Sequence, residues 1–122
     1  MVKPKTKTQK KIDHNIQLAL TRACEEFLQS VTGFQWLTHR ADYSNFPSSL
    51  RVICIFDNNL NQQHACQSET YRQMHKQIQS ELLNIGIKLP QTAGQIIFDS
   101  EESCNGTHQG NWALRLDSRS IK

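Results

Sequence analysis

The sequence predicts an α+β two-layer sandwich, in which a mostly antiparallel four-stranded sheet carries two helices on one face. Three observations predict this fold. Two segments carry apolar residues at helical spacing, four short segments suit strands, and together they follow the order α-β-β-α-β-β. The chain has 122 residues, enough for one domain, which we expect to span residues 12–122.

The first helix is expected over residues 12–31, where apolar side chains recur every three or four positions. Gly33 should end it, because glycine readily adopts the backbone conformation that follows a helix. Residues 34–43 are rich in aromatic and β-branched side chains and predict the first strand. Beyond a turn at Pro47, the apolar run of residues 50–56 predicts a central strand. The connection between these two predicted strands is short, which predicts an antiparallel hairpin.

The second helix follows the polar stretch DNNLN, whose short side chains suit helix N-caps. Its apolar stripe ends at Ile85, and Gly86 closes it. Residues 94–99 and 111–116 are then expected to form the third and fourth strands around the polar loop SEESCNGTHQG. Two strands in this region leave no place for a helix-turn-helix.

Two tryptophans are the candidate interface residues. With both helices on one face, the other face of the sheet would be open, and Trp36 or Trp112 on it would offer a binding or dimer surface. The alternative is that both rings pack in the core, the commoner use of a large side chain.

Charge is concentrated at the N-terminus. The net charge is +3, yet only nine Lys and Arg remain against 11 acidic residues in residues 12–122. We predict that residues 1–11 form a disordered arm that binds nucleic acid without sequence preference, because each lysine that neutralises a phosphate releases a counterion. The five lysines are Lys3, Lys5, Lys7, Lys10 and Lys11. The alternative is an arm that only solubilises the chain.

The location is expected to be cytoplasmic. The N-terminus lacks the apolar region of a signal peptide, and no stretch is long and apolar enough for a membrane span. The four cysteines match neither a CxxC pair nor a compact disulfide framework, so reduced thiols are expected.

The densest polar cluster lies in the last predicted loop and supplies the candidate metal or ligand residues. The spacing Cys-x3-His suits zinc, but no second pair of ligands accompanies it. We therefore expect no cofactor, with a divalent metal at this loop as the alternative to a solvated turn. The candidates are Asp99, Glu101, Cys104, His108 and Asn111.

Catalytic motifs are absent from the sequence, which favours a non-enzymatic protein. His39, Asp42 and Asp57 form the other set that invites comparison with metal-dependent nucleases. The predicted hairpin separates the two aspartates by roughly 16 Å along a strand, too far for one metal. Asp57 is more simply explained as a cap between a strand and a helix.

Three segments of the chain resemble a known group of proteins: IDHNIQLALTRACEEFL, GFQWLTHRADYSNFPSSLRVICIFDNN and FDSEESCNGTHQGNWALRL. Together they resemble a small, uncharacterised bacterial family often labelled "Fis family transcriptional regulator", over about residues 12–116. The family brings no established activity. Its label implies a nucleic-acid partner, which the Lys-rich arm suggests independently.

The sequence thus leads to three hypotheses. The first is a non-enzymatic cytoplasmic binding or regulatory module, associated with nucleic acid through its basic arm. The second is a protein-interaction or homodimerising domain that uses the open sheet face. The third is a metal-assisted hydrolase with its site in the loop of residues 99–111.

Overall fold

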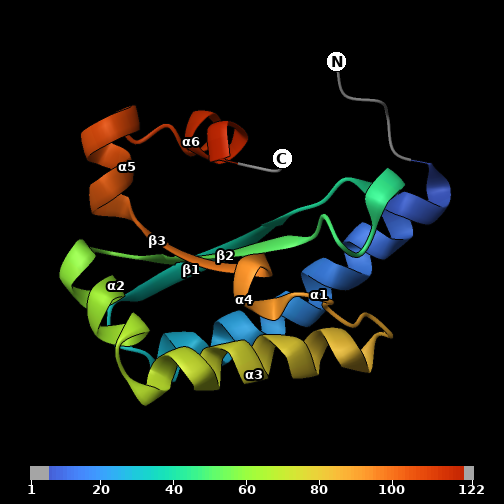
Figure 1. Cartoon of the computed structure of the whole chain (residues 1–122), viewed down its shortest axis with the longest axis horizontal. Coiled ribbons are helices and arrows are strands. Elements are labelled where there is room, and N and C mark those ends of the chain that lie inside the picture. The colour runs from blue at the N-terminus through green and yellow to red at the C-terminus, as the bar shows by residue number, and fades with distance from the viewer. Residues whose placement is uncertain (1–5, 120–122) are drawn as a thin grey trace.

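A three-stranded mixed sheet lies at the centre of the fold in the computed structural model, which describes residues 6–119 (Figure 1). Its order is β1 (Phe34–Arg40), β2 (Arg51–Phe56) and β3 (Ile96–Ser100). β1 and β2 form the expected antiparallel hairpin, while β2 and β3 are parallel. Parallel pairing follows from the connection, because the helices between β2 and β3 return the chain to the end of the sheet where β2 began.

One face of the sheet is covered by α1 (Lys7–Ser30) and α3 (Glu69–Asn84), which lie side by side beneath it in Figure 1. Arg22 and Glu81 join these helices by an ion pair of 2.9 Å. The apolar residues of these two helices buried in this layer are Ile16, Ala19, Leu20, Ala23 and Phe27 from α1, and Met74, Ile78 and Leu82 from α3. This layer forms the main core, because both stripes face the apolar side chains of β2.

Shorter elements connect the strands. The hairpin loop contains a 3-10 turn, η1 (Tyr43–Asn45), and α2 (Asn59–Cys66) follows β2 directly. α4 (Thr92–Gln95) leads into β3. No helix in residues 6–119 is long and apolar enough to cross a membrane.

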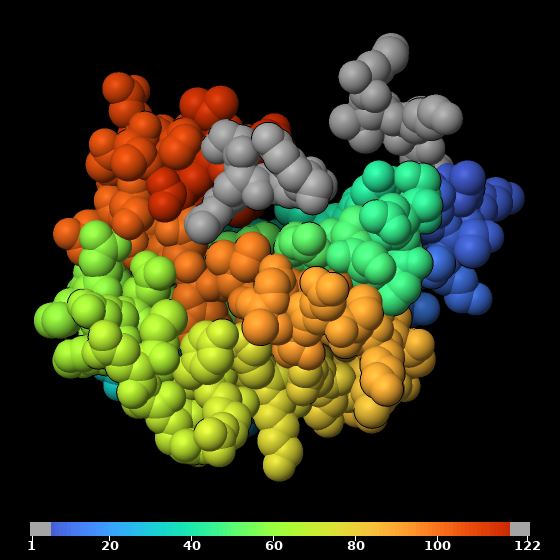
Figure 2. Space-filling view, in the orientation of Figure 1, coloured from blue at the N-terminus to red at the C-terminus, as the bar shows by residue number. Residues whose placement is uncertain are grey.

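The opposite face of the sheet carries a second, smaller layer formed by α5 (Glu101–His108) and α6 (Trp112–Arg119). In the space-filling view these two helices form a separate orange-red lobe above the sheet (Figure 2). The residues buried under the lobe are Ile53, Ile55 and Leu116, with Trp36 and Trp112 packed against them.

The α+β class is confirmed, but the predicted four-stranded sheet is wrong. The segment expected as the fourth strand is α6, and the polar loop before it is α5. Trp112 and Leu116 are four residues apart, so in a helix both face the sheet. The sheet therefore has three strands and helices on both faces. The reason given against a helix-turn-helix, two strands in this region, is wrong too, since two helices joined by three residues occupy it.

Several helix boundaries also differ from expectation. α1 begins at Lys7, so residues 7–11 of the expected disordered arm are helical. Thr6 caps this helix, and its hydroxyl accepts a hydrogen bond from the Gln9 amide at 3.1 Å. The expected second helix is divided into α2 and α3, because Ser68 starts a new N-cap. Gly33 has φ +81°, the left-handed conformation expected of it.

Candidate functional site

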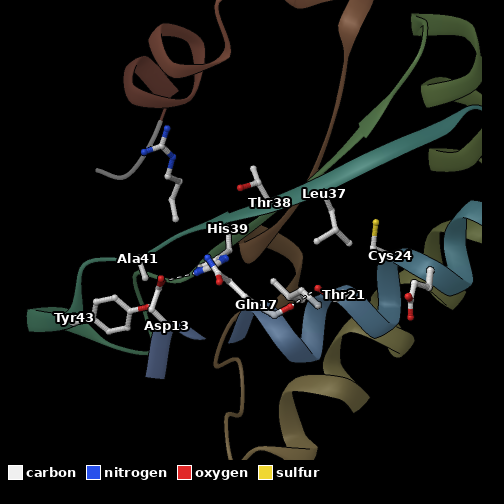
Figure 3. A pocket seen from close by; sticks show the side chains of 12 residues that line it. Asp13, Gln17, Thr21, Cys24, Leu37, Thr38, His39, Ala41 and Tyr43 are labelled. Carbon is white, nitrogen blue, oxygen red and sulfur yellow. Dashed lines mark hydrogen bonds and ion pairs between the residues drawn. The ribbon is translucent and has the colours of Figure 1, made fainter. Parts of the chain in front are cut away.

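A groove of about 720 Å³ runs along the outer edge of β1 (Figure 3). α1 forms one wall, and β1 with the residues after it forms the other. Leu37 and His39 point from β1 towards α1, whereas Thr38 points to the opposite face of the sheet. Because both faces of β1 contribute, the groove follows the strand edge. Its α1 wall consists of Asp13, Gln17, Leu20, Thr21, Cys24 and Glu25.

The edge of β1 is open to a further strand. Within residues 6–119 no strand pairs with it on the side away from β2. The Leu37 backbone amide hydrogen-bonds the Cys24 sulfur on α1, so this amide points out of the sheet. Backbone groups alternate in direction along an antiparallel strand, and the His39 backbone therefore points outward as well.

The other edge of the sheet is covered. α2 lies against β3, and the Gln62 side-chain amide donates to the Phe98 carbonyl oxygen at 3.1 Å. A side chain thus takes the place that a neighbouring strand would have. Of the two edges, β1 is the one that has a groove beside it and that pairs with no second strand in the described part of the chain.

One end of the groove is fixed by a hydrogen-bonded cluster of three side chains. Asp13 Oδ1 lies 2.8 Å from His39 Nε2 and accepts a hydrogen bond of 2.7 Å from the Tyr43 hydroxyl (Figure 3). Burial, followed by the hydrogen bond to Asp13, raises the pKa of Tyr43 well above its usual value. The cluster holds the start of α1 against the hairpin, and its phenol stays protonated.

No cysteine is activated as a nucleophile. Burial is the largest cause of a raised pKa at each of the four thiols, including Cys24 in the groove. A reactive cysteine requires a lowered pKa, because the thiolate is the attacking form. The groove therefore contains a protonated thiol beside the Leu37 amide.

The predicted metal or ligand cluster is an ion-paired clip between β3 and α6. Asp99 is buried at the end of β3 and receives two hydrogen bonds from Arg115, of 2.7 and 2.9 Å. Cys104 is fully buried on α5, and His108 Nδ1 lies 3.3 Å from Arg115 Nη1. A guanidinium thus occupies the place beside Asp99 where a cation would bind. Residues 6–119 contain no group of three or more His, Cys, Asp or Glu arranged to hold a metal.

The remaining two residues of that predicted cluster act on helix ends. Glu101 is the first residue of α5, where its negative charge interacts favourably with the helix dipole and stabilises the helix. The Asn111 side chain accepts from the Leu114 amide at 3.0 Å and caps α6. Neither position adds a ligand next to the Asp99 carboxylate.

The separation expected for the second polar set is confirmed. Asp42 lies beyond the pair of Arg40 and Arg51 at the turn of the hairpin, whereas Asp57 lies beyond Phe56 at the other end of β2. Asp57 accepts hydrogen bonds from the Asn58 amide and the Asn61 side chain, of 2.7 and 2.9 Å. Asp57 therefore supports the start of α2, but the N-cap itself is Asn58 rather than the predicted Asp57.

The candidate interface and nucleic-acid residues lie in three places. Trp36 and Trp112 are half-buried and pack edge to face, with ring centroids 5.1 Å apart, so α6 covers the sheet face expected to be open. Lys7, Lys10 and Lys11 are exposed on the first turns of α1, coloured blue at the rim of the molecule in Figure 2. Lys3 and Lys5 lie outside the described residues.

Sequence reasoning found one residue of the groove, His39, and gave it the wrong companions. Its partner is Asp13, which lies 26 residues earlier on α1. The available signal was the position of Asp13 between Ile12 and Ile16, at the border of the apolar stripe. A polar side chain at such a border meets the edge of the sheet that its helix covers.

The helix pair at the C-terminal end has the order of a helix-turn-helix, but its described side chains do not suit a recognition helix. Trp112 and Leu116 face the sheet, and Arg115 is bound to Asp99. A recognition helix presents clustered basic side chains instead. The resemblance to the Fis-labelled family stays a prediction. No family model, curated protein or solved structure matches this chain.

Proposed function

We propose that the chain is a non-enzymatic binding module whose partner is another polypeptide, bound as an added strand along β1. The observation that carries this proposal is the groove of about 720 Å³ beside the open strand edge, with α1 as its outer wall. A peptide in this groove hydrogen-bonds the outward backbone groups of β1 and places alternate side chains against α1. The cytoplasmic location expected from the sequence is part of the same proposal.

The lining of the groove suits an extended main chain. Leu20 and Leu37 supply apolar contact, and Thr21 and Thr38 supply hydroxyl groups. Strand addition obtains its affinity from backbone hydrogen bonds and its specificity from such contacts to every second side chain. The lining therefore supports a peptide rather than a compact small molecule.

The titratable groups of the groove support binding rather than catalysis. His39 and Tyr43 are both engaged with Asp13. Burial raises the pKa of the Cys24 thiol, which keeps it in its less reactive form. These side chains fix the walls of the groove and leave no activated nucleophile in it.

Random peptides displayed on phage and selected on the full chain test the proposal. Thr21 is exposed on the groove side of α1, so Thr21→Trp fills the groove without entering the core. Ser80→Trp places the same ring on an exposed position of α3 and is the matched control. We expect selected peptides to bind wild type and Ser80→Trp equally, and Thr21→Trp at least about tenfold more weakly.

The mode of binding is tested with a synthetic copy of the strongest peptide, methylated at one backbone nitrogen at a time. Strand addition predicts that affinity is lost at every second position, since only those amides face β1. Peptides that tolerate methylation throughout, or that bind Thr21→Trp as tightly as wild type, would contradict the proposal.

A second candidate function is nucleic-acid binding through the start of α1. The observation that favours it is the stripe of exposed lysines at positions 7, 10 and 11, with no acidic residue in the first turn. Three positive charges at a helix N-terminus oppose the helix dipole, and a phosphate backbone beside them would relieve this repulsion. Lys3 and Lys5 belong to the same hypothesis.

Fluorescence anisotropy with a labelled DNA duplex tests this second function at about 50 and 200 mM salt. Changing Lys7, Lys10 and Lys11 to Gln should remove most of the binding. The matched control changes three exposed cations elsewhere to Gln, namely Arg72, Lys76 and Lys88. Equal loss in both variants would show a dependence on net charge alone and would reject α1 as the site.

A further inference from the structure

We infer that the strand accepted by β1 is β1 of a second copy of this chain, so that two sheets join edge to edge around a twofold axis. This inference rests on the proposed function, because it names the partner of the same groove. Three observations carry it: the length of the groove, the charges at its two ends, and the exposed leucines of α1.

The groove is long enough for most of one β1 strand. β1 contains seven residues, which span about 23 Å in extended conformation. The α1 wall of the groove runs from Asp13 to Glu25, which spans about 18 Å of helix. The groove therefore accommodates about five residues of a second β1.

The charges at the two ends are opposite. Lys10 lies at the end fixed by the Asp13 cluster, whose carboxylate is engaged by His39 and Tyr43. Arg40 at the same end is already paired with Asp117 of α6 at 3.4 Å. Glu25 is exposed at the other end. A twofold axis places each end of one groove against the opposite end of its copy, so the basic end of each meets the acidic end of the other.

Two exposed leucines flank the groove on α1. The exposed fractions are 49% for Leu18 and 55% for Leu28. Leu28 lies one helical turn beyond Cys24 and continues the groove-lining stripe. Edge-to-edge pairing brings the two α1 helices alongside each other, antiparallel, under the joined sheet. The second α1 then covers apolar surface that the single chain leaves in water.

Sedimentation velocity of the full chain, with two charge reversals on α1, tests the inference. Lys10→Glu and Glu25→Lys each create like charges at both ends of the pair and should raise the dissociation constant at least about tenfold. An equimolar mixture of the two variants restores opposite charges at both ends, as does the double variant, and both should dimerise like wild type. Lys88→Glu is the control for an unrelated exposed lysine.

Three results would overturn the inference: a wild-type chain that stays monomeric at its highest soluble concentration, a dimer that both single reversals leave unchanged, or a dimer that persists in Thr21→Trp. The peptide selection separates this failure from failure of the proposed function. A monomer that still binds peptides in the groove loses the second copy as partner and keeps strand addition. A monomer that binds none loses both.

Discussion

The two faces of the sheet are covered by different means. Eighteen buried apolar side chains hold α1, α2 and α3 on one face, whereas three hold α5 and α6 on the other. The smaller layer has in addition the buried pair of Asp99 and Arg115, which joins β3 to α6. The main layer depends on apolar area, whereas the smaller layer combines little apolar area with polar contacts, of which the pair of Asp99 and Arg115 is the buried one.

This difference determines how each layer responds to change. Apolar burial is spread over many residues and is proportional to area, so the main core loses stability in steps as atoms are removed. A buried ion pair is concentrated in two side chains, and removing one of them leaves the other in a costly environment. The comparison predicts that substitutions in the main core lower the stability of the whole fold, whereas substitutions at the buried ion pair destabilise only the smaller layer.

The largest effect is expected in the main core. Ile78 is fully buried on α3, and Ile78→Ala should lower the free energy of unfolding by about 3 kcal/mol, because it removes apolar contact and leaves a cavity. Leu83→Ala on the same helix is the control, since Leu83 is 61% exposed and its change should cost under about 0.5 kcal/mol. Urea denaturation measures both. Equal losses would show that the burial of α3 is not what stabilises this layer.

A smaller and more local effect is expected at the clip. Arg115→Met removes the positive charge beside the Asp99 carboxylate, whose side chain is 4% exposed, and should cost about 2 kcal/mol. Hydrogen exchange should rise in α5 and α6 while α1 and α3 stay protected. The double variant Asp99→Leu with Arg115→Leu should recover most of the loss, because a buried pair is often replaceable by apolar residues. Faster exchange spread over all helices would contradict the local character of the clip.

The main layer could be predicted from the sequence because its information is periodic. The apolar residues of α1 and α3 recur at helical spacing, and Gly33 and Gly86 mark where the chain turns. Each of these patterns depends on neighbouring residues alone. The hairpin of β1 and β2 was predictable for the same reason.

The second layer could not be predicted by the same reasoning. The segment that forms α5 is mostly polar, and this composition indicated a loop. The missed signal was at its start, where Ser100 is the N-cap of α5 and Glu101 is the first helical residue. Trp112 and Leu116 suit a strand as well as a helix, because the segment is too short for its period to decide. The position of α6 depends on contacts between distant residues, such as Asp99 with Arg115 and Trp36 with Trp112, which no local pattern contains.

The groove was missed for a related reason. A strand edge becomes a site only when the fold leaves that edge unpaired, and the expected fourth strand left the order of the sheet open. His39 was recognisable as a polar residue in a strand, but its pairing with Asp13 depends on how α1 crosses β1. The sequence patterns located α1 and β1, but they did not show how α1 packs across β1.

The smallest effect is expected at a buried polar side chain of the main layer. His75 on α3 is 8% exposed, and its Nε2 is the buried side-chain atom without a hydrogen-bond partner in residues 6–119. Burial lowers the pKa of His75 below its usual value, although the Tyr71 carbonyl at Nδ1 opposes the shift. The unfolded chain therefore binds a proton at higher pH than the folded chain does.

It follows that the contribution of His75 to stability is complete above about pH 6.5 and declines as the pH falls through its lowered folded pKa. Urea denaturation between about pH 7.5 and 5 should show this decline in wild type and a flatter profile in His75→Phe, whose ring suits the contacts with Tyr71 and Phe98. His64→Gln, at an exposed histidine, should keep the wild-type profile. If His75→Phe showed the same decline in stability with falling pH as wild type, the acid sensitivity would arise from other groups and not from His75.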